Sequence, residues 1–234
     1  MFYNILFFRI IVYLWSKIKV MKVLNLYAGI GGNRKLWTDV EVTAVEWEPK
    51  IAEIYQDLYP DDTVIVGDAH QYLLEHFREF DFIWGSPPCP THSRFKFLHN
   101  AEVAGKSQKY EYPDMTLWQE IIFLQSWFKG KYCIENVIIY YEPLIRPIES
   151  NNHYFWTNFN IRKLKNEKRG IRGQSEKYRY ELIGIDLSKY KISSELKKKV
   201  INNCVEPKTG LHILECARGI IKSQDVTQRT IFDV

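Results

Sequence analysis

The chain has 234 residues, of which 46% are hydrophobic and 26% charged, and its net charge is +4. This composition predicts one globular domain with a sizeable core and excludes fibrous and disordered classes. The four cysteines form neither a CxxC pair nor a Cys/His cluster at zinc spacing, which argues against a disulfide framework and a metal site. We therefore expect an intracellular, cytoplasmic protein.

The charge is unevenly distributed. Residues 1–20 carry +3, residues 21–154 carry −7 and residues 155–234 carry +8. Neutralisation of phosphates supplies most non-specific affinity for nucleic acids, so a basic C-terminal third suits a polyanion-binding protein. A lysine-rich face that is merely solvated explains the charge equally well.

The first 20 residues are aromatic and apolar but are interrupted by Arg9. The run is too short and broken for a membrane span, and it lacks the positive start and cleavage site of a signal peptide. We treat it as an N-terminal extension of unknown role, either an extra packed helix or the result of a start assigned upstream of Met21. No membrane association is expected.

From Met21 onward, short apolar runs alternate with longer amphipathic ones. Strands are predicted over residues 22–29, 41–47, 62–68, 81–88, 131–137, 153–161 and 178–185. Helices are predicted over residues 33–37, 51–59, 70–80, 115–130, 193–203 and 211–222. The alternation predicts an α/β, Rossmann-like fold with a parallel sheet, whose ligands bind at the carboxyl ends of the strands.

Three strand ends carry residues suited to a nucleoside. A glycine-rich turn from Tyr27 to Gly32 follows the first strand, where backbone and the start of a helix could approach a ligand. Glu46 and Trp47 end the second strand, and Asp68 follows the third. A carboxylate there can bind ribose hydroxyls. Each signal alone is weak, because the turn is not GxGxxG, but their order predicts a nucleoside pocket.

A cysteine and a glutamate follow the next two strands. Cys89 comes directly after two prolines, which hold the backbone rigid at the ligand edge, whereas a free cysteine is more often a small buried hydrophobe. Glu135 ends the following strand. A thiolate and a neighbouring acid are what nucleophilic attack on a pyrimidine requires. His92 could lower the pKa of Cys89, or could be only a phosphate or solvent contact.

These motifs resemble, in order and approximate spacing, those of the cytosine-5 DNA methyltransferases. The resemblance rests on YAGIGG, the Glu46-Trp47 strand end, Gly67-Asp68, SPPCPTHS, IENV and the C-terminal NNCVEP, and covers residues 21 to about 216. It implies an S-adenosylmethionine-dependent methyltransferase domain over 21–234. That domain divides into a cofactor and catalytic core (21–150), a reduced, basic DNA-binding region (151–200), and a last cofactor motif with a C-terminal helix (201–234).

The resemblance also implies residue roles. Cys89 would attack carbon 6 of an extruded cytosine while Glu135 holds N3 and the amino group, so that carbon 5 takes the methyl group. S-adenosylmethionine would be bound by Tyr27, Ala28, Gly29, Ile30, Gly31, Gly32, Glu46, Trp47, Asp68, Ala69, Ser86, Asn203 and Val205.

Some positions depart from the family pattern. Asn25 replaces the usual aspartate of the first strand, and Pro90 replaces the glutamine after the cysteine. The family's Arg-x-Arg motif is not clear. Lys177 and Arg179 have suitable spacing, and we take Arg179 as the third catalytic residue, with His153 as a competing candidate.

Only some twenty residues separate Gly184 from Asn202, where the family usually inserts a target-recognition domain. Reading a sequence needs an element that reaches base edges, so we expect short or relaxed specificity. Compact enzymes of this kind resemble those of phages, which protect viral DNA from restriction. We expect a monomer that acts on DNA.

Two other functions fit the same sequence. Methylation of cytosine in RNA is the nearest alternative, and a partner-dependent DNA-binding subunit with weak activity is the second. The presence of Cys89, Glu135 and the glycine turn together argues against the second, because a pure binding module has no use for a rigidly held thiol. A structural protein with an incidental glycine turn is the third alternative.

Overall fold

The computed structural model describes residues 20–94, 111–164 and 176–221. Its centre is one seven-stranded sheet with the strand order β3-β2-β1-β4-β5-β7-β6. The strands are β1 (Met21–Leu26), β2 (Val40–Glu46), β3 (Thr63–Val66), β4 (Phe82–Gly85), β5 (Lys131–Val137), β6 (Ile148–Ser150) and β7 (His153–Thr157).

The first five strands are parallel and their carboxyl ends are aligned. Leu26 lies opposite both Val45 and Gly85, and Gly85 lies opposite Ile134, so four loops leave the sheet at one edge. β7 is antiparallel to β5 and pairs with the short edge strand β6. The predicted Rossmann-like sheet is confirmed, with an antiparallel hairpin at one side.

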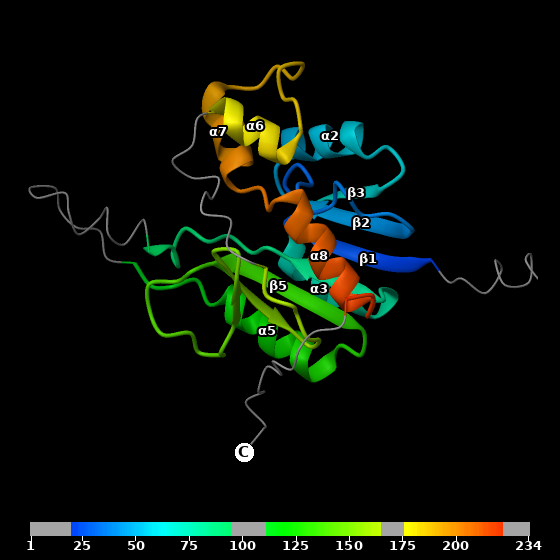
Figure 1. Cartoon of the computed structure of the whole chain (residues 1–234), viewed down its shortest axis with the longest axis vertical. Helices are drawn as coiled ribbons and strands as arrows, with labels where there is room; N and C mark the ends of the chain where they lie inside the picture. Colours follow the sequence, from blue (N-terminus) through cyan, green and yellow to red (C-terminus); the bar gives the residue numbers. More distant parts are fainter. Residues whose placement is uncertain (1–19, 95–110, 165–175, 222–234) are drawn as a thin grey trace, which may run out of the picture.

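Helices cover both faces of the sheet (Figure 1). The helices are α2 (Pro49–Leu58), α3 (Ala69–His76), α5 (Thr116–Trp127), α6 (Glu176–Ile183), α7 (Ser194–Asn202) and α8 (Pro207–Ala217), and a 3-10 turn, η1 (Phe77–Glu79), follows α3. α3 and α5 pack on the face that carries Leu24 and Leu26, whereas α8 packs on the opposite face against Val23 and Trp84. Strands buried on both faces explain the near-continuous apolar runs in the sequence.

α6 and α7 pack beside α2 rather than extending the sheet (Figure 1). Their apolar side chains, with those of the 185–187 segment, meet Ile30, Ile51 and Ile54 in one cluster. Asp57 at the rim of this contact accepts hydrogen bonds from Lys189 (2.7 Å) and Tyr190 (2.5 Å). Residues 176–202 are therefore attached to the α2 side of the domain.

Two secondary-structure predictions are wrong. Residues 33–37 form successive turns instead of a helix. The Arg34 guanidinium donates two hydrogen bonds to Asp62 (2.8 and 2.9 Å). The backbone N–H of Lys35 donates to the Gly32 carbonyl, and that of Trp37 donates to the Arg34 carbonyl. Residues 178–185, predicted as a strand, lie mostly in α6, whose last turn ends at Gly184 with φ of 63°. Glycine in this left-handed conformation is a common helix stop. Residues 1–19 lie outside the described residues.

Candidate active site

A cavity of about 570 Å³ opens at the carboxyl edge of the sheet. Its walls come from the ends of β1, β2, β3, β4 and β5, from the start of β7, and from residues 199–205. Pockets of this size accommodate a small-molecule ligand. The crevice outside the strand ends is also where ligands of such sheets bind.

The glycine-rich turn is fastened by Glu46. Its carboxylate accepts a hydrogen bond from the backbone N–H of Gly29 (2.9 Å) and another from the N–H of Glu48 (2.9 Å). Tyr27, Gly29 and Gly31 all have positive φ (55°, 56° and 73°), which lets the chain turn sharply within five residues. The turn is shaped by Glu46 and not, as the sequence suggested, by the start of a following helix.

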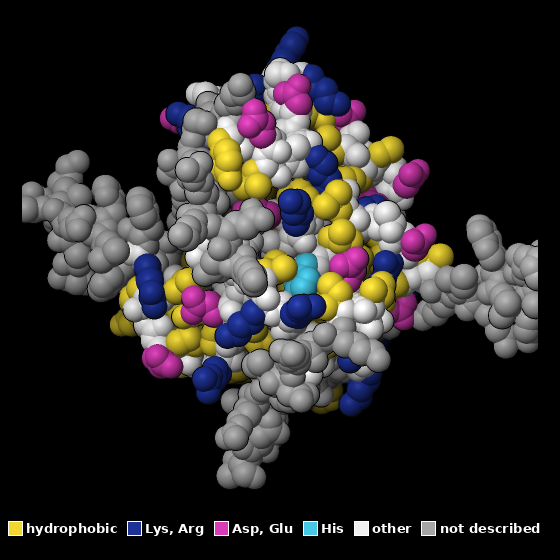
Figure 2. Space-filling model, viewed as in Figure 1, with side chains coloured by type: hydrophobic (Ala, Val, Ile, Leu, Met, Phe, Trp, Pro, Cys, Tyr) yellow, Lys and Arg dark blue, Asp and Glu magenta, His cyan; other side chains and the backbone are white. Residues whose placement is uncertain are grey.

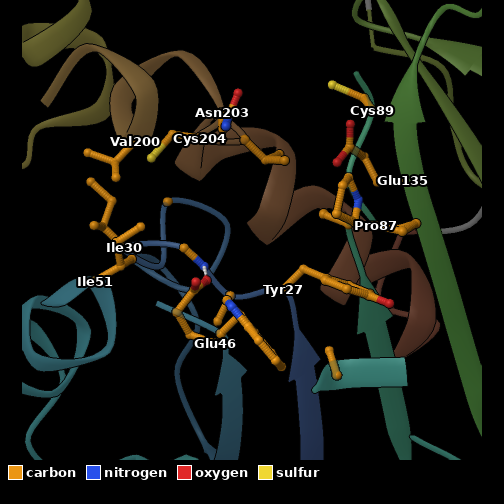
Figure 3. A pocket seen from close by; sticks show the side chains of 18 of the residues that line it. Tyr27, Ile30, Glu46, Ile51, Pro87, Cys89, Glu135, Val200, Asn203 and Cys204 are labelled. Atoms are coloured by element: carbon orange, nitrogen blue, oxygen red, sulfur yellow. Dashed lines mark hydrogen bonds between the residues drawn. The ribbon is translucent and has the colours of Figure 1, made fainter. Parts of the chain in front are cut away.

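The rim of the cavity combines an exposed ring with a capped helix. Trp47 lines the cavity and is 73% exposed, so its ring is available to a ligand. Asp68 lines it too, and accepts bonds from the N–H groups of His70 (2.8 Å) and Gln71 (3.2 Å) at the start of α3. Figure 3 shows Ile30 and Ile51 on one side of the pocket and Asn203 and Cys204 above Glu46.

The cysteine loop is braced from β5. Asn136 donates from Nδ2 to the carbonyl of Pro87 (3.0 Å), and the Cys89 carbonyl accepts bonds from the N–H groups of His92 (3.0 Å) and Ser93 (3.1 Å). Trp84 donates to the hydroxyl of Ser86 (2.8 Å). Prolines have no backbone N–H and cannot donate such bonds themselves. Donors from neighbouring residues therefore hold the Pro-Pro-Cys loop and its thiol in position.

Glu135 lies beside Cys89 at the far end of the same cavity (Figure 3). Its side chain is almost wholly buried, and its Oε1 lies 2.5 Å from Nδ1 of His153 on β7. A thiol, a buried carboxyl group and an imidazole thus share one pocket with the glycine turn. Such a set can perform nucleophilic catalysis assisted by an acid.

Residues 21–139 match the sequence model of the C-5 cytosine-specific DNA methylases. The match spans half of the chain. The chain belongs to this family. No curated protein is similar enough to count as a match.

Solved structures with partial similarity include a DNMT2 mutant of Spodoptera frugiperda (24% identity, 50% of this chain, 35% of that one, TM-score 0.34). Another is a putative DNA modification methyltransferase encoded within a prophage (E. coli), with 20% identity, 52% and 33% coverage and a TM-score of 0.34. The chain spans about a third of the length of these two proteins.

Most of the predicted site residues line this one cavity: Tyr27, Ala28, Gly29, Ile30, Gly32, Glu46, Trp47, Asp68, Ala69, Ser86, Cys89, Glu135, Asn203 and Val205. Gly31 does not. It packs instead under Tyr55 and Tyr59, where an added Cβ would lie 2.4 Å from a ring carbon.

Arg179 does not line the cavity either. It lies on α6 and donates from Nη1 to Asn202 (2.5 Å), which does line it. The competing candidate, His153, lies within the cavity. His92 is fully buried beside Tyr141, and burial lowers the pKa of its imidazole, which disfavours the charged form.

Sequence reasoning missed a carboxylate beneath the pocket. Glu120 on α5 is buried and accepts hydrogen bonds from the hydroxyl of Tyr27 (2.5 Å) and from His70 (3.1 Å). Burial raises the pKa of Glu120, and the hydrogen bond to Glu120 raises the pKa of His70. Glu120 is the single charged residue in the stretch 116–128, and this was the available signal.

S-adenosylmethionine is the methyl donor of this family. Among the described residues, no group of three or more His, Cys, Asp or Glu is placed to hold a metal ion. Nor does any helix in the described ranges reach the length and apolarity that crossing a membrane requires.

Proposed function

We propose that the chain is an S-adenosylmethionine-dependent methyltransferase that acts on carbon 5 of cytosine in DNA through a covalent bond to Cys89. The observation that carries this proposal is that one cavity joins two sets of residues. The glycine turn, held by Glu46, forms one end, and Cys89 and Glu135 form the other. Membership of the C-5 cytosine methylase family supports it independently.

The residues of the first end suit the methyl donor. Glu46 already accepts two backbone bonds, but a carboxylate has about four lone-pair sites, which leaves capacity for the two hydroxyls of a ribose. Trp47 offers an exposed ring to an adenine, and Asn203 and Val205 line the same cavity. When bound, S-adenosylmethionine supplies an activated methyl group.

The residues of the other end suit the base. Cys89 as thiolate adds to carbon 6 of the pyrimidine, and Glu135 holds N3 and the exocyclic amino group, so that electron density gathers on carbon 5. Glu135 is buried and Cys89 sits in a braced loop, so both groups keep their positions during the reaction. Access to the ring face requires the cytosine to leave a duplex or to come from a single strand.

Readout of a long target sequence is not expected. Between β7 and α8 the described residues contain only the short helices α6 and α7, and these pack on the α2 side of the domain. On the face seen in Figure 2, Lys and Arg side chains are interspersed with acidic and apolar ones among the described residues. We therefore propose short or relaxed specificity, with residues 151–200 making mainly backbone contacts to DNA.

The test is transfer of a labelled methyl group from S-adenosylmethionine to cytosine-containing DNA, to cytosine-free DNA and to RNA. The variants are Cys89→Ser and, as a matched control, Cys216→Ser, because Cys216 is buried in the sheet–α8 core away from the cavity. We expect 5-methylcytosine in DNA with the wild type and the control, and none with Cys89→Ser.

Each other outcome has a definite meaning. Transfer to RNA alone would replace DNA as the substrate. Binding of S-adenosylmethionine without transfer to any nucleic acid would favour a partner-dependent subunit. Undiminished transfer by Cys89→Ser would overturn the covalent mechanism.

A further inference from the structure

The acid of the proposed reaction is not alone in its pocket. Nδ1 of His153 lies 2.5 Å from Oε1 of Glu135, and both side chains line the cavity. The pairing follows from the sheet: β5 and β7 are antiparallel, with Val137 opposite His153 and Glu135 opposite Phe155, so the two side chains are diagonal neighbours on one face. Diagonal neighbours of this kind are within reach of long side chains.

This pair matters because of what the pyrimidine requires. When a thiolate adds to carbon 6, negative charge spreads to N3, and a proton delivered to N3 lowers the barrier. That proton must come from a group that can hold it close to the base, and a carboxyl group with a hydrogen-bonded imidazole offers such a path. An imidazole titrates near neutrality and can hold the proton that the carboxyl group passes on.

We propose that His153 is a positioning residue that acts through Glu135: it orients the carboxyl group and supplies the proton that N3 of the cytosine takes up. The inference rests on the proposed function and extends it, since it names where the proton is held before the reaction. Arg179 has no part in this step, because it lies outside the cavity and is bonded to Asn202.

Proton transfer accompanies the attack of Cys89 on the base. The thiolate of Cys89 forms a bond to carbon 6, and the π electrons of the carbon 5–carbon 6 double bond shift towards carbon 4 as those of the carbon 4–N3 double bond move onto N3. N3 takes a proton from the carboxyl group of Glu135, and Glu135 regains one from Nδ1 of His153, which becomes neutral. After methyl transfer, the proton of carbon 5 leaves to water and the bond to Cys89 breaks. N3 then returns its proton by the same route.

Few other titratable groups surround the pair among the described residues. Cys133 precedes Glu135 by two positions on the same face of β5, and burial holds the pKa of its thiol well above the usual value, so it stays neutral. Glu149 on β6 is exposed and lies opposite Tyr154, on the other face. Cys89 lies beside Glu135, and Lys199 also lines the cavity. Glu206 ahead of α8 accepts a bond from Asn151 near the start of β7.

The experiment compares His153→Gln with Tyr154→Phe, a neighbour on β7 whose side chain packs against the opposite core of the sheet. For each, kcat and the KM for S-adenosylmethionine are measured from pH 6 to about pH 9 with cytosine-containing DNA. In the wild type, kcat should fall at alkaline pH as His153 loses its proton. His153→Gln should lower kcat by about 10²-fold, keep the KM for S-adenosylmethionine and abolish the alkaline fall.

A second readout separates proton supply from folding. Cys89 should form a covalent adduct with DNA that contains 5-fluorocytosine, and in His153→Gln this adduct should form about 10²-fold more slowly although S-adenosylmethionine still binds. Equal kcat and an unchanged pH profile in His153→Gln would overturn the inference while leaving the proposed function intact. Absence of methyl transfer by the wild type would instead overturn the proposed function.

Discussion

Replacing Gly210 by alanine should destabilise the protein although alanine is the better helix former. Gly210 lies in α8, and a Cβ at this position would stand 2.1 Å from the carbonyl oxygen of Asn33 and 2.6 Å from its Cα. Both are backbone atoms, so no side-chain rotation can relieve the overlap. Helix propensity favours alanine by about 0.5–1 kcal/mol. Overpacking costs about 1–3 kcal/mol, and overlap with rigid backbone belongs to the upper part of this range, about 2–3 kcal/mol. After the gain in helix propensity, this leaves a net loss of about 1–2 kcal/mol in the free energy of unfolding.

Urea denaturation of the full chain measures this loss. With a slope of about 2 kcal/mol per molar urea, the midpoint should fall by about 0.5–1 M. Gly67→Ala is the matched control, because a Cβ at Gly67 would meet nothing closer than Ile65 at 3.9 Å, and its midpoint should stay near that of the wild type. If Gly210→Ala unfolds at the wild-type midpoint or above it, the argument from close backbone contact is wrong.

Three further predictions concern buried and reactive groups. Tyr27→Phe removes a donor to the buried Glu120 and should lower the free energy of unfolding by about 1–3 kcal/mol in urea denaturation, whereas an unchanged midpoint would contradict the role of that bond. Because the pKa values of both His70 and Glu120 are raised in the folded state, the native protein binds more protons than the unfolded chain. The stability contributed by this pair should therefore decline as the pH rises from about 4.5 through the folded pKa of His70, and denaturation of wild type and Glu120→Gln across this range should show it. Iodoacetamide should label the half-exposed Cys89 well before Cys204, because burial raises the pKa of Cys204 to about 12; equal labelling by peptide mass spectrometry would refute this.

The parts of the fold that the sequence predicted well depend on short-range pattern. The runs that become β1, β2, β4 and β5 are apolar because both faces of the sheet are covered, and this periodicity is visible without any tertiary information. The carboxyl ends of parallel strands meet at one edge, so Glu46, Cys89 and Glu135 could be placed in one pocket before any coordinates.

What could not be predicted depends on contacts between distant residues. The segment after the glycine turn is not helical because Arg34 is held by Asp62, which lies 28 positions further on. The period-two pattern around Tyr180 suggested a strand, but its partners are the side chains of α7 and α2, and Gly184 ends a helix there. The role of His153 likewise depends on the register of an antiparallel strand that the sequence does not state.

The wall of the cavity formed by residues 199–205 has a consequence for how the protein matures. All the other lining residues lie between Tyr27 and His153, so about 45 residues must follow before this wall exists. A chain emerging from the ribosome can assemble the strands early, since domains fold as their segments appear. The pocket is not complete until α7 and α8 dock, because the Val205 carbonyl between them packs directly against Gly32 of the glycine turn. A ligand that binds only the finished pocket stabilises the finished fold alone, so cofactor supply should favour complete chains over folding intermediates.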